Sequence, residues 1–346
     1  MSWTKRYLSF FIVIFSILFA ILLAEISLRI LGIGYGNSPI EASEVLHHVH
    51  PKNYKYRAHD PAGEYGNFDV VYDEFRYRVS GEKIEKLLNG EQRKIYFLGD
   101  SFTEAVQVGW ADSFVGKIGS THQKTYVRNM GVSSYSPLFY LIQLKTELAN
   151  VRNADVVLQL YENDFDSDSG MRHKANSEDI RKIESINGEG ASLIIQLLRY
   201  SYVARLVRKV QLQIAYLMNP SSQAVSFQKD REPDNHRKQS AEKREFSYKI
   251  LNEIKEFCDT RLLKLHIMII PNKTLARSNE SGDQDWLHEE VKVFAKTNKI
   301  SFIDLAKEFQ KISNQKDLFF PVDIHLTIAG HDIVYRIIEE HLYLKN

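Results

Sequence analysis

The stretch KIYFLGDSFTEAVQVG, residues 94 to 109, joins an apolar run to a small polar cluster. The run from Ile95 to Leu98 has no polar alternation, which is typical of a strand buried on both faces of a parallel sheet. The cluster from Gly99 to Thr103 then marks a change from strand to helix. Ser101 stands at this junction, either as part of an ordinary helix cap or as a nucleophile presented at the end of the strand.

The same alternation of apolar strand and helical segment continues along the chain. The strands are expected at 94–98, 125–130, 155–161, 263–270 and 300–305. The helices are expected at about 112–122, 137–150, 243–260, 284–298 and 329–343. Strands joined by helices in this way form right-handed crossovers. The sequence therefore predicts an α/β protein, a three-layer α/β/α sandwich with a parallel sheet of about five strands.

An insertion at about 171–245 interrupts this pattern between the third and fourth strands. Its amphipathic part, 191–218, predicts one or two helices, and its charged part, 219–245, predicts a solvated loop. The basic residues of the helical part are Arg199, Arg205, Arg208 and Lys209. We expect a helix packed on the domain with a solvated basic face, and the alternative is that this face binds anionic lipid headgroups.

The N-terminal residues 1–32 predict a single transmembrane helix. The segment from Tyr7 to Ala24 contains no charged residue, and a helix continued to about Gly32 is long enough to cross a bilayer. Lys5 and Arg6 precede it, which favours a cytoplasmic N-terminus. An uncleaved signal anchor is favoured over a cleaved signal peptide, and both place the remaining chain on the extracytoplasmic (periplasmic or outer) side.

Residues 33–90 predict short strands and loops that lead into the main domain, 91–346. The cluster of His47, His48 and His50 lacks carboxylate or cysteine at a supporting spacing. It is therefore interpreted as a surface loop rather than a metal site, and no metal or other cofactor is expected.

Composition narrows the classes of function. The chain has 346 residues, 44% of them hydrophobic, which suits a sizeable core. Its net charge of +1 gives no indication of nucleic-acid binding. The lone cysteine, Cys258, cannot form an intramolecular disulfide.

Polar clusters follow the expected strands and precede the last helix. They are Gly99–Thr103, Asn129–Gly131, Asn163–Asp164 and Asp323–His325. In an open parallel sheet, ligands bind outside the carboxyl ends of the strands, where these clusters are expected to meet. A hydroxyl, amides, an imidazole and a carboxylate together are the groups needed for acyl transfer by a serine.

These clusters, in this order, resemble the SGNH (GDSL-type) hydrolase superfamily. The matching blocks are GDSFT, NMGVSSYSP, END and DIHLTIAGH, and the resemblance extends over about residues 70–346. It implies an SGNH-hydrolase, flavodoxin-like fold. Asp323 lies two residues before His325. This spacing resembles that in membrane-anchored envelope proteins of alginate and polysaccharide O-acetylation. Tyr161 departs from the family pattern, which usually has glycine at that position.

Chemistry assigns a role to each matched residue. Ser101 is the candidate nucleophile, His325 the general base and then acid, and Asp323 the residue that orients the imidazole. The candidate oxyanion donors are the backbone N–H groups of Ser101 and Gly131 and the side-chain amide of Asn163. No substrate-binding residue is assigned. The aromatic residues expected near the site are Tyr135, Tyr161 and Trp110, and aromatic side chains near a cleft either stack on sugar rings or pack in the interior.

The sequence leaves three functions open. The first is a serine-dependent ester hydrolase acting on acyl, principally acetyl, esters of an extracytoplasmic glycan or another small ester. The second is an O-acyltransferase that uses the same serine and requires a separate membrane protein to supply the acyl donor. The third is a catalytically silent scaffold that binds glycan. In each case the expected partners are a carbohydrate and the membrane, with no nucleic acid.

Overall fold

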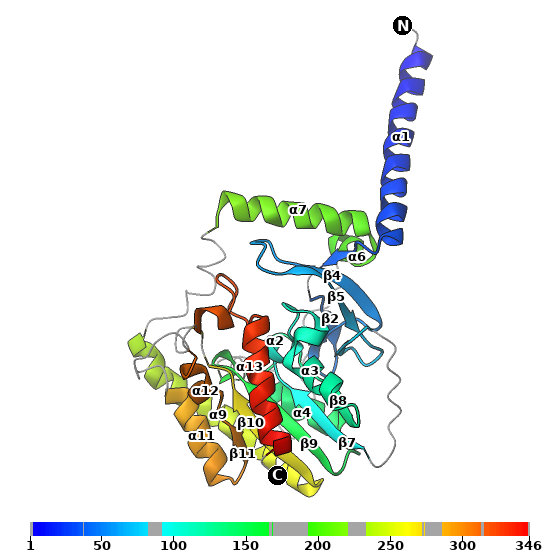
Figure 1. The fold of residues 1–346 in the computed structure, drawn as a ribbon. Coiled ribbons are helices and arrows are strands. Elements are labelled where there is room, and N and C mark those ends of the chain that lie inside the picture. The colour runs from blue at the N-terminus through cyan, green and yellow to red at the C-terminus, as the bar shows by residue number, and fades with distance from the viewer. Residues whose placement is uncertain are drawn as a thin grey trace.

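A computed structural model describes the chain in several ranges, which together contain every expected strand of the main sheet. These are residues 3–36, 38–81, 92–165, 168, 193–220, 233–271, 273, 286–312 and 315–344. A main α/β unit carries a smaller β unit at one end, and a long helix projects from that end (Figure 1).

The main sheet has five parallel strands. They are β7 (Arg93–Leu98), β8 (Thr125–Asn129), β9 (Ala154–Leu160), β10 (Leu263–Ile269) and β11 (Ser301–Ile303). Their spatial order is β8-β7-β9-β10-β11, which in sequence order is the flavodoxin-like 2-1-3-4-5 arrangement. The predicted parallel sheet is confirmed, and each strand was predicted to within two residues at both ends.

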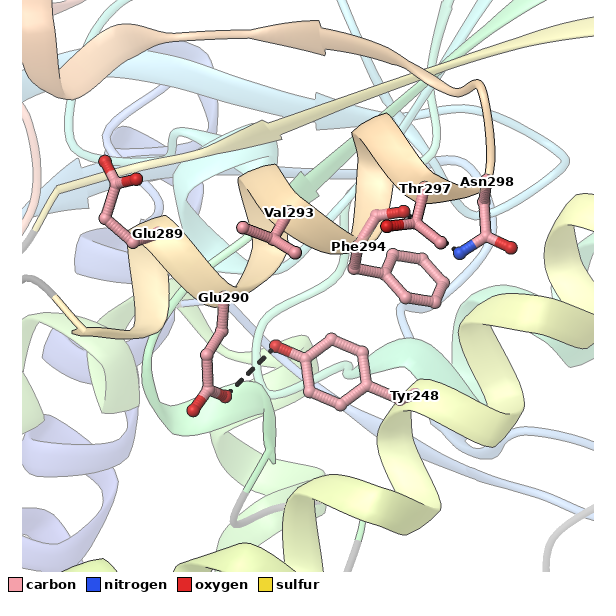
Figure 2. A pocket seen from close by; sticks show the side chains of 7 residues that line it. All are labelled: Tyr248, Glu289, Glu290, Val293, Phe294, Thr297 and Asn298. Carbon is pink, nitrogen blue, oxygen red and sulfur yellow. Dashed lines mark hydrogen bonds between the residues drawn. The ribbon is translucent and has the colours of Figure 1, made fainter.

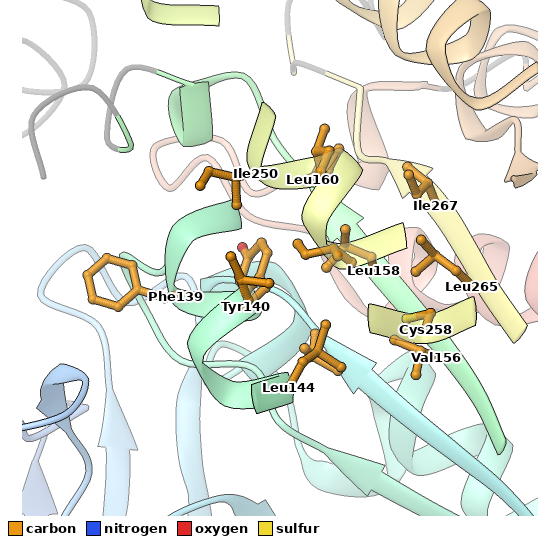
Figure 3. Close-up of a cluster of buried hydrophobic side chains, with 14 of the residues drawn as sticks. Phe139, Tyr140, Leu144, Val156, Leu158, Leu160, Ile250, Cys258, Leu265 and Ile267 are labelled. Carbon is orange, nitrogen blue, oxygen red and sulfur yellow. The ribbon is translucent and has the colours of Figure 1, made fainter. Parts of the chain in front are cut away.

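Helices cover both faces of this sheet. Side chains of α3 (Phe114–Thr121), α12 (Leu305–Gln310) and α13 (Ile328–Glu339) pack on one face. Those of α4 (Pro137–Glu147), α9 (Pro233–Thr260) and α11 (Trp286–Thr297) pack on the other. Figure 3 shows the second of these cores, between α4, α9 and the sheet. The three-layer α/β/α sandwich is therefore confirmed.

The interior strand β7, between β8 and β9, contributes to both cores. Ile95 and Phe97 contact the α3 and α13 side, and Tyr96 and Leu98 contact the α4 and α9 side. Two apolar faces explain why this stretch is continuously apolar rather than alternating. Burial of its four side chains fixes the strand end, and therefore the position of the residue that follows it.

Residues before the main sheet form a second, smaller sheet. Its strands, in spatial order, are β1 (Tyr35–Gly36), β4 (Tyr54–His59), β5 (Gly66–Tyr72) and β6 (Arg78–Val79). A separate antiparallel pair is made by β2 (Glu41–Ser43) and β3 (His47–Val49). The small sheet has its own core, which includes Tyr56, Val70 and Tyr72 and contacts Val106 of the main unit.

The prediction of a surface loop at the histidine cluster is wrong. His47, His48 and His50 are all buried. The ring of His48 packs edge-on against Tyr135, with the ring centroids 5.1 Å apart, and the ring of His50 stacks on Tyr72 at 4.3 Å. The cluster belongs to the contact between the small sheet and the main unit, which sequence spacing alone does not reveal.

The insertion contains α6 (Leu193–Tyr200) and α7 (Tyr202–Met218), in agreement with the prediction of one or two helices. Residues 171–192 and 221–232 lie outside the described residues. The prediction of a loop up to residue 245 is wrong, because α9 already begins at Pro233. Proline is well tolerated in the first helical turn, so the charged run after it extends the helix.

The N-terminal helix α1 (Trp3–Ile30) projects from the molecule (Figure 1). Within its segment Tyr7–Ile30, an 18-residue window has a mean hydropathy of 2.7 and is not buried within the protein. Length and composition are therefore those of a membrane span, and a signal sequence would have the same properties.

Candidate active site

Ser101 is the first residue of α2 (Ser101–Glu104), which begins directly after β7. Asp100 caps this helix, and its carboxylate accepts a hydrogen bond from the Phe102 backbone N–H at 2.9 Å. The helix has only four residues and ends at Ala105, whose φ of 58° lies in the left-handed region. The strand, the cap and this tight end hold Ser101 at the carboxyl edge of the sheet, where its side chain is partly exposed.

His325 and Asp323 approach Ser101 from the loop that precedes α13. The Ser101 Oγ lies 2.6 Å from His325 Nε2, and His325 Nδ1 lies 2.5 Å from Asp323 Oδ1. The same Asp323 oxygen accepts the His325 backbone N–H at 2.8 Å, which fixes the carboxylate against the ring. These three residues, predicted from segments more than 200 positions apart, form the hydrogen-bonded chain of a Ser-His-Asp triad.

The electrostatics of the three residues suit proton transfer. Burial by itself would lower the pKa of His325, but the charges of Asp323 and Asp100 outweigh it and raise that pKa above 6.5. Burial by itself would raise the pKa of Asp323, but the charge and hydrogen bonds of His325 lower that pKa. Burial raises the pKa of Asp100 to about 6. A histidine able to take and return a proton therefore lies beside an ionised acid.

Gly131 does not have the contact expected of an oxyanion donor in this structure. Its backbone N–H donates to Asn129 Oδ1 at 2.9 Å, and the Asn129 amide donates to the Thr103 carbonyl at 2.7 Å. A Cβ on Gly131 would lie only 2.4 Å from the Glu104 backbone nitrogen. Asn129 and Gly131 thus hold the loop after β8 tightly against α2, and the oxyanion role of Gly131 stays a prediction.

Asn163 lies exposed in the turn that follows β9, and its oxyanion role likewise stays a prediction. The adjacent Asp164 is buried and accepts hydrogen bonds from the Tyr161 backbone N–H and the Tyr140 hydroxyl, at 3.2 and 3.4 Å. Burial and the nearby Asp100 charge raise the pKa of Asp164. Asp164 therefore closes the turn that carries Asn163.

The aromatic candidates for sugar stacking serve mainly as packing residues. Tyr135 is buried and stacks on Phe139, with the ring centroids 4.6 Å apart. Tyr161, which departs from the family pattern, is also buried and packs against Phe102 at the same separation. Phe102 in turn contacts the His325 ring, at 4.7 Å. Tyr161 thus supports the triad indirectly, through one intervening ring.

The close approach at Gly131 gives a testable expectation. We expect Gly131→Ala to destabilise the protein by about 1–3 kcal/mol, because the added methyl group meets backbone atoms of Thr103 and Glu104 that cannot move independently of α2. Urea unfolding measures this change. Gly119→Ala on α3 is the matched control, since its methyl group would lie 3.7 Å from Val127, an ordinary contact. Equal stability of the two variants would contradict this account.

Glu104, the last residue of α2, is a supporting residue that sequence reasoning missed. It is buried, and its carboxylate accepts hydrogen bonds from Ser38 at 2.7 Å and from Tyr72 at 2.5 Å. His50 forms an ion pair with it at 3.2 Å. Burial opposes ionisation of Glu104, but the charge and hydrogen bond of His50 lower its pKa below the ordinary value. The small sheet thereby holds the end of the nucleophile helix.

Arg78 of β6 supports the same region from the small sheet. Its buried guanidinium donates to the backbone carbonyls of Glu104, Ala105 and Val108. These carbonyls lie at the last residue of α2 and beyond it, where the chain leaves the helical path, so they have no partners within a helix. Arg78 therefore satisfies the backbone of the turn that positions Ser101.

The small β unit also contacts the acid side of the triad. Glu64 accepts the backbone N–H groups of Val322 and Asp323 at 2.6 and 2.8 Å. The Tyr65 hydroxyl lies 3.4 Å from Asp323 Oδ2. In the main unit, the Gln107 carboxamide lies 3.0 Å from His325 Nδ1. The segment predicted as a simple lead-in thus contributes contacts to both arms of the triad.

A cavity of about 640 Å³ lies between α9 and α11, where Tyr248 donates a hydrogen bond to Glu290 (Figure 2). Its lining residues are Tyr248, Glu289, Glu290, Val293, Phe294, Thr297 and Asn298. None belongs to the triad or to the clusters at the strand ends. The cavity is therefore separate from the candidate active site.

No protein-family model and no curated protein matches this chain. Among solved structures, it is similar to a member of the lipolytic protein G-D-S-L family from Veillonella parvula DSM 2008. The sequence identity is 12%, the match covers 73% of this chain and 100% of that chain, and the TM-score is 0.42. It is also similar to an acetyl xylan esterase, AlAXEase, with 14% identity, 72% and 99% covered, and a TM-score of 0.42.

A third similar structure is a catalytic mutant of an acetylxylan esterase from Geobacillus stearothermophilus, with 12% identity, 72% of this chain and 94% of that chain covered, and a TM-score of 0.43. Identities and TM-scores are low in all three cases. These similarities therefore assign no function to the chain, and the residues of the site are the basis for one.

Proposed function

We propose that this protein is a serine-dependent ester hydrolase of the SGNH type. The observation that carries the proposal is the hydrogen-bonded chain from Ser101 Oγ through His325 to Asp323 at the carboxyl edge of the sheet. A serine hydroxyl is a weak nucleophile until a neighbouring base takes its proton. The intact chain of groups also favours catalysis over a silent scaffold.

The proposed reaction has two halves. His325 Nε2 takes the proton of Ser101 while Oγ attacks the ester carbonyl carbon, and Asp323 stabilises the imidazolium. The candidate donors to the tetrahedral oxyanion are the Ser101 N–H, the Asn163 amide and the Gly131 N–H, the last of which would have to leave Asn129 Oδ1. His325 returns its proton to the leaving alcohol oxygen, which breaks the ester bond. His325 then takes a proton from water, whose oxygen bonds to the acyl carbon. The proton passes to Ser101 Oγ as the acyl–Oγ bond breaks, which releases the carboxylic acid and restores the serine.

The proposed substrates are acyl, principally acetyl, esters of an extracytoplasmic glycan. Two sequence features support this choice. Lys5 and Arg6 precede the uncharged segment Tyr7–Ala24 of α1, which favours an extracytoplasmic catalytic unit. The spacing of Asp323 and His325 resembles that of envelope acyl-transfer proteins. Under this proposal α1 is a membrane anchor, and the site works on polymers outside the cytoplasm.

Acetate release and acetyl transfer distinguish the hydrolase from an O-acyltransferase. The purified full-length protein in detergent is incubated with p-nitrophenyl acetate, alone and with a de-acetylated glycan acceptor. A hydrolase releases acetate at the same rate in both samples and leaves the glycan unmodified. Acetylated glycan, detected by mass spectrometry, would assign the protein to the transferases. Absence of both products would contradict the proposed esterase.

The pH dependence tests the proposed role of His325. The imidazole must be neutral to accept the Ser101 proton, and Asp323 raises its pKa above 6.5 against the opposing effect of burial. We therefore expect kcat/KM to increase with pH and to reach half its maximum above pH 6.5. The assay is the hydrolysis rate between mildly acidic and mildly alkaline pH. A rate that stays constant over this range would exclude His325 as the base.

A further inference from the structure

The helix α7 (Tyr202–Met218) has an exposed apolar stripe along one face. Its members are Val207, Val210, Ile214, Leu217 and Met218, which are 50%, 45%, 52%, 76% and 81% exposed. Successive positions in this set are separated mostly by three or four residues, the spacing that places side chains on one face of a helix. We call these five residues the α7 stripe.

The opposite face of α7 carries Arg205 and Lys209, which contact the small sheet. Arg205 is buried, with its guanidinium 5.0 Å from the ring centroid of Tyr54 and hydrogen-bonded to the Tyr54 hydroxyl. The Lys209 ammonium lies 3.9 Å from the ring centroid of Tyr35. The expectation of a helix packed on the domain is confirmed for α7, but the expectation of a solvated basic face is wrong for Arg205 and Lys209. Arg205 and Lys209 face the protein, and the five residues of the α7 stripe face outward.

The start of α7 is attached to α1. The Glu25 carboxylate of α1 accepts hydrogen bonds from the Ser201 hydroxyl at 2.9 Å and from the backbone N–H groups of Tyr202 and Val203 at 3.0 and 2.9 Å. Arg29 of α1 lies over the Tyr202 ring, 4.8 Å from its centroid. A side chain of α1 thus caps α7 and fixes the position at which α7 begins.

This attachment sets the level of α7 relative to the apolar part of α1. Glu25 directly follows the uncharged segment from Tyr7 to Ala24, which is the part of α1 suited to a hydrocarbon core. Figure 1 shows α7 crosswise to α1, at the end of the molecule from which α1 projects, with β4 and β5 on its other side. The α7 stripe therefore continues the exposed apolar surface of α1 at the edge of that segment.

We propose that the α7 stripe lies in the surface of the bilayer that α1 spans. A helix with one apolar face and cationic flanks binds in the plane of a membrane interface, with the apolar face at the boundary between headgroups and acyl chains. Arg208, exposed beside the stripe, is available to anionic headgroups. Two crossed helices joined by Glu25 would hold the α/β unit in a single orientation on the membrane, which one flexible anchor would not do.

Site-specific fluorescence tests this placement in the full-length protein. Cys258 is buried, so a thiol-reactive, polarity-sensitive fluorophore labels introduced cysteines in the native protein. The labelled variants are Val207→Cys and Ile214→Cys in the stripe, Phe15→Cys in α1 and Glu289→Cys on α11. Each is placed in nanodiscs of phosphatidylcholine and phosphatidylglycerol, with and without lipids that carry a nitroxide quencher.

We expect blue-shifted emission and strong quenching by the nitroxide lipids at positions 207, 214 and 15. At position 289, an exposed site on the main unit, we expect neither effect. Quenching at position 15 together with unquenched emission at 207 and 214 would overturn the proposal. Blue-shifted but unquenched emission at 207 and 214 would instead indicate coverage by protein and would overturn it as well. Absence of quenching at position 15 would remove the anchor on which it depends.

Discussion

Ser101→Ala is expected to lower kcat for p-nitrophenyl acetate by on the order of 10⁴-fold or more. The substitution removes the atom that forms the acyl intermediate, and the His325 Nε2 that lies 2.6 Å from it loses its partner. Oxyanion donors and substrate binding would remain, so a small rate above the uncatalysed one is expected to persist. The measurement is steady-state hydrolysis by the full-length protein, with active-site titration of the wild type by a serine-reactive phosphonate.

Ser120→Ala is the matched control for this loss. Ser120 is an exposed serine at the end of α3, and its hydroxyl donates only to the nearby Lys117 carbonyl. Its replacement should leave kcat and the phosphonate titration unchanged. Both variants should unfold at about the wild-type temperature, because neither hydroxyl is buried in a core. Equal hydrolysis rates for wild type and Ser101→Ala would eliminate Ser101 as the nucleophile.

The main sheet was predictable from sequence because its strands have apolar residues on both faces. The run from Ile95 to Leu98 contributes two side chains to each core, so its pattern is unambiguous and the glycine after it marks the strand end. The short strands of the small sheet carry no such signal. β1, for example, has two residues and pairs in parallel with β4, whose partner residues lie more than 20 positions away. Pairing of this kind depends on contacts that no local pattern contains.

The triad was predictable for a different reason, since each of its members lies at a strand end or just before a helix. Its supporting residues were not. Glu104 is a charged residue beside the nucleophile, and His50 is one of three clustered histidines, but their ion pair joins segments 54 positions apart. Arg78 likewise donates to backbone carbonyl groups. Because every residue has such a group, no sequence motif marks these partners. Burial of a charge becomes evident only when its partners are in place.

The orientation of α7 shows a further limit of sequence patterns. Its amphipathic spacing predicted a helix correctly, and the same spacing is compatible with an apolar face against the domain or against a membrane. The structure excludes the first arrangement for the α7 stripe, because Arg205 on the other side of the helix is buried against Tyr54 of the small sheet. A period of apolar residues identifies a face, and only the tertiary contacts show what that face meets.

Asp323→Ala is expected to lower kcat by on the order of 10⁴-fold, close to the effect of losing the nucleophile. Asp323 Oδ1 accepts both the ring Nδ1 and the backbone N–H of His325, so its removal frees the imidazole to rotate and to protonate on the wrong nitrogen. Asp332→Ala on α13 is the control, because its carboxylate forms only a half-exposed ion pair with Lys117.

Asp323→Asn separates the charge of this residue from its geometry. An amide oxygen can replace Oδ1 and keep both hydrogen bonds to His325, while the negative charge is lost. Burial then lowers the pKa of His325 with less opposition, so the half-maximum of kcat/KM should move to lower pH, and the plateau should lie between those of wild type and Asp323→Ala.

If the asparagine variant keeps the wild-type midpoint while the alanine variant loses activity, Asp323 acts by orientation alone. If the alanine variant keeps wild-type kcat, Asp323 is not part of the catalytic machinery. Other contacts must then orient His325, such as that of the Gln107 carboxamide, 3.0 Å from Nδ1.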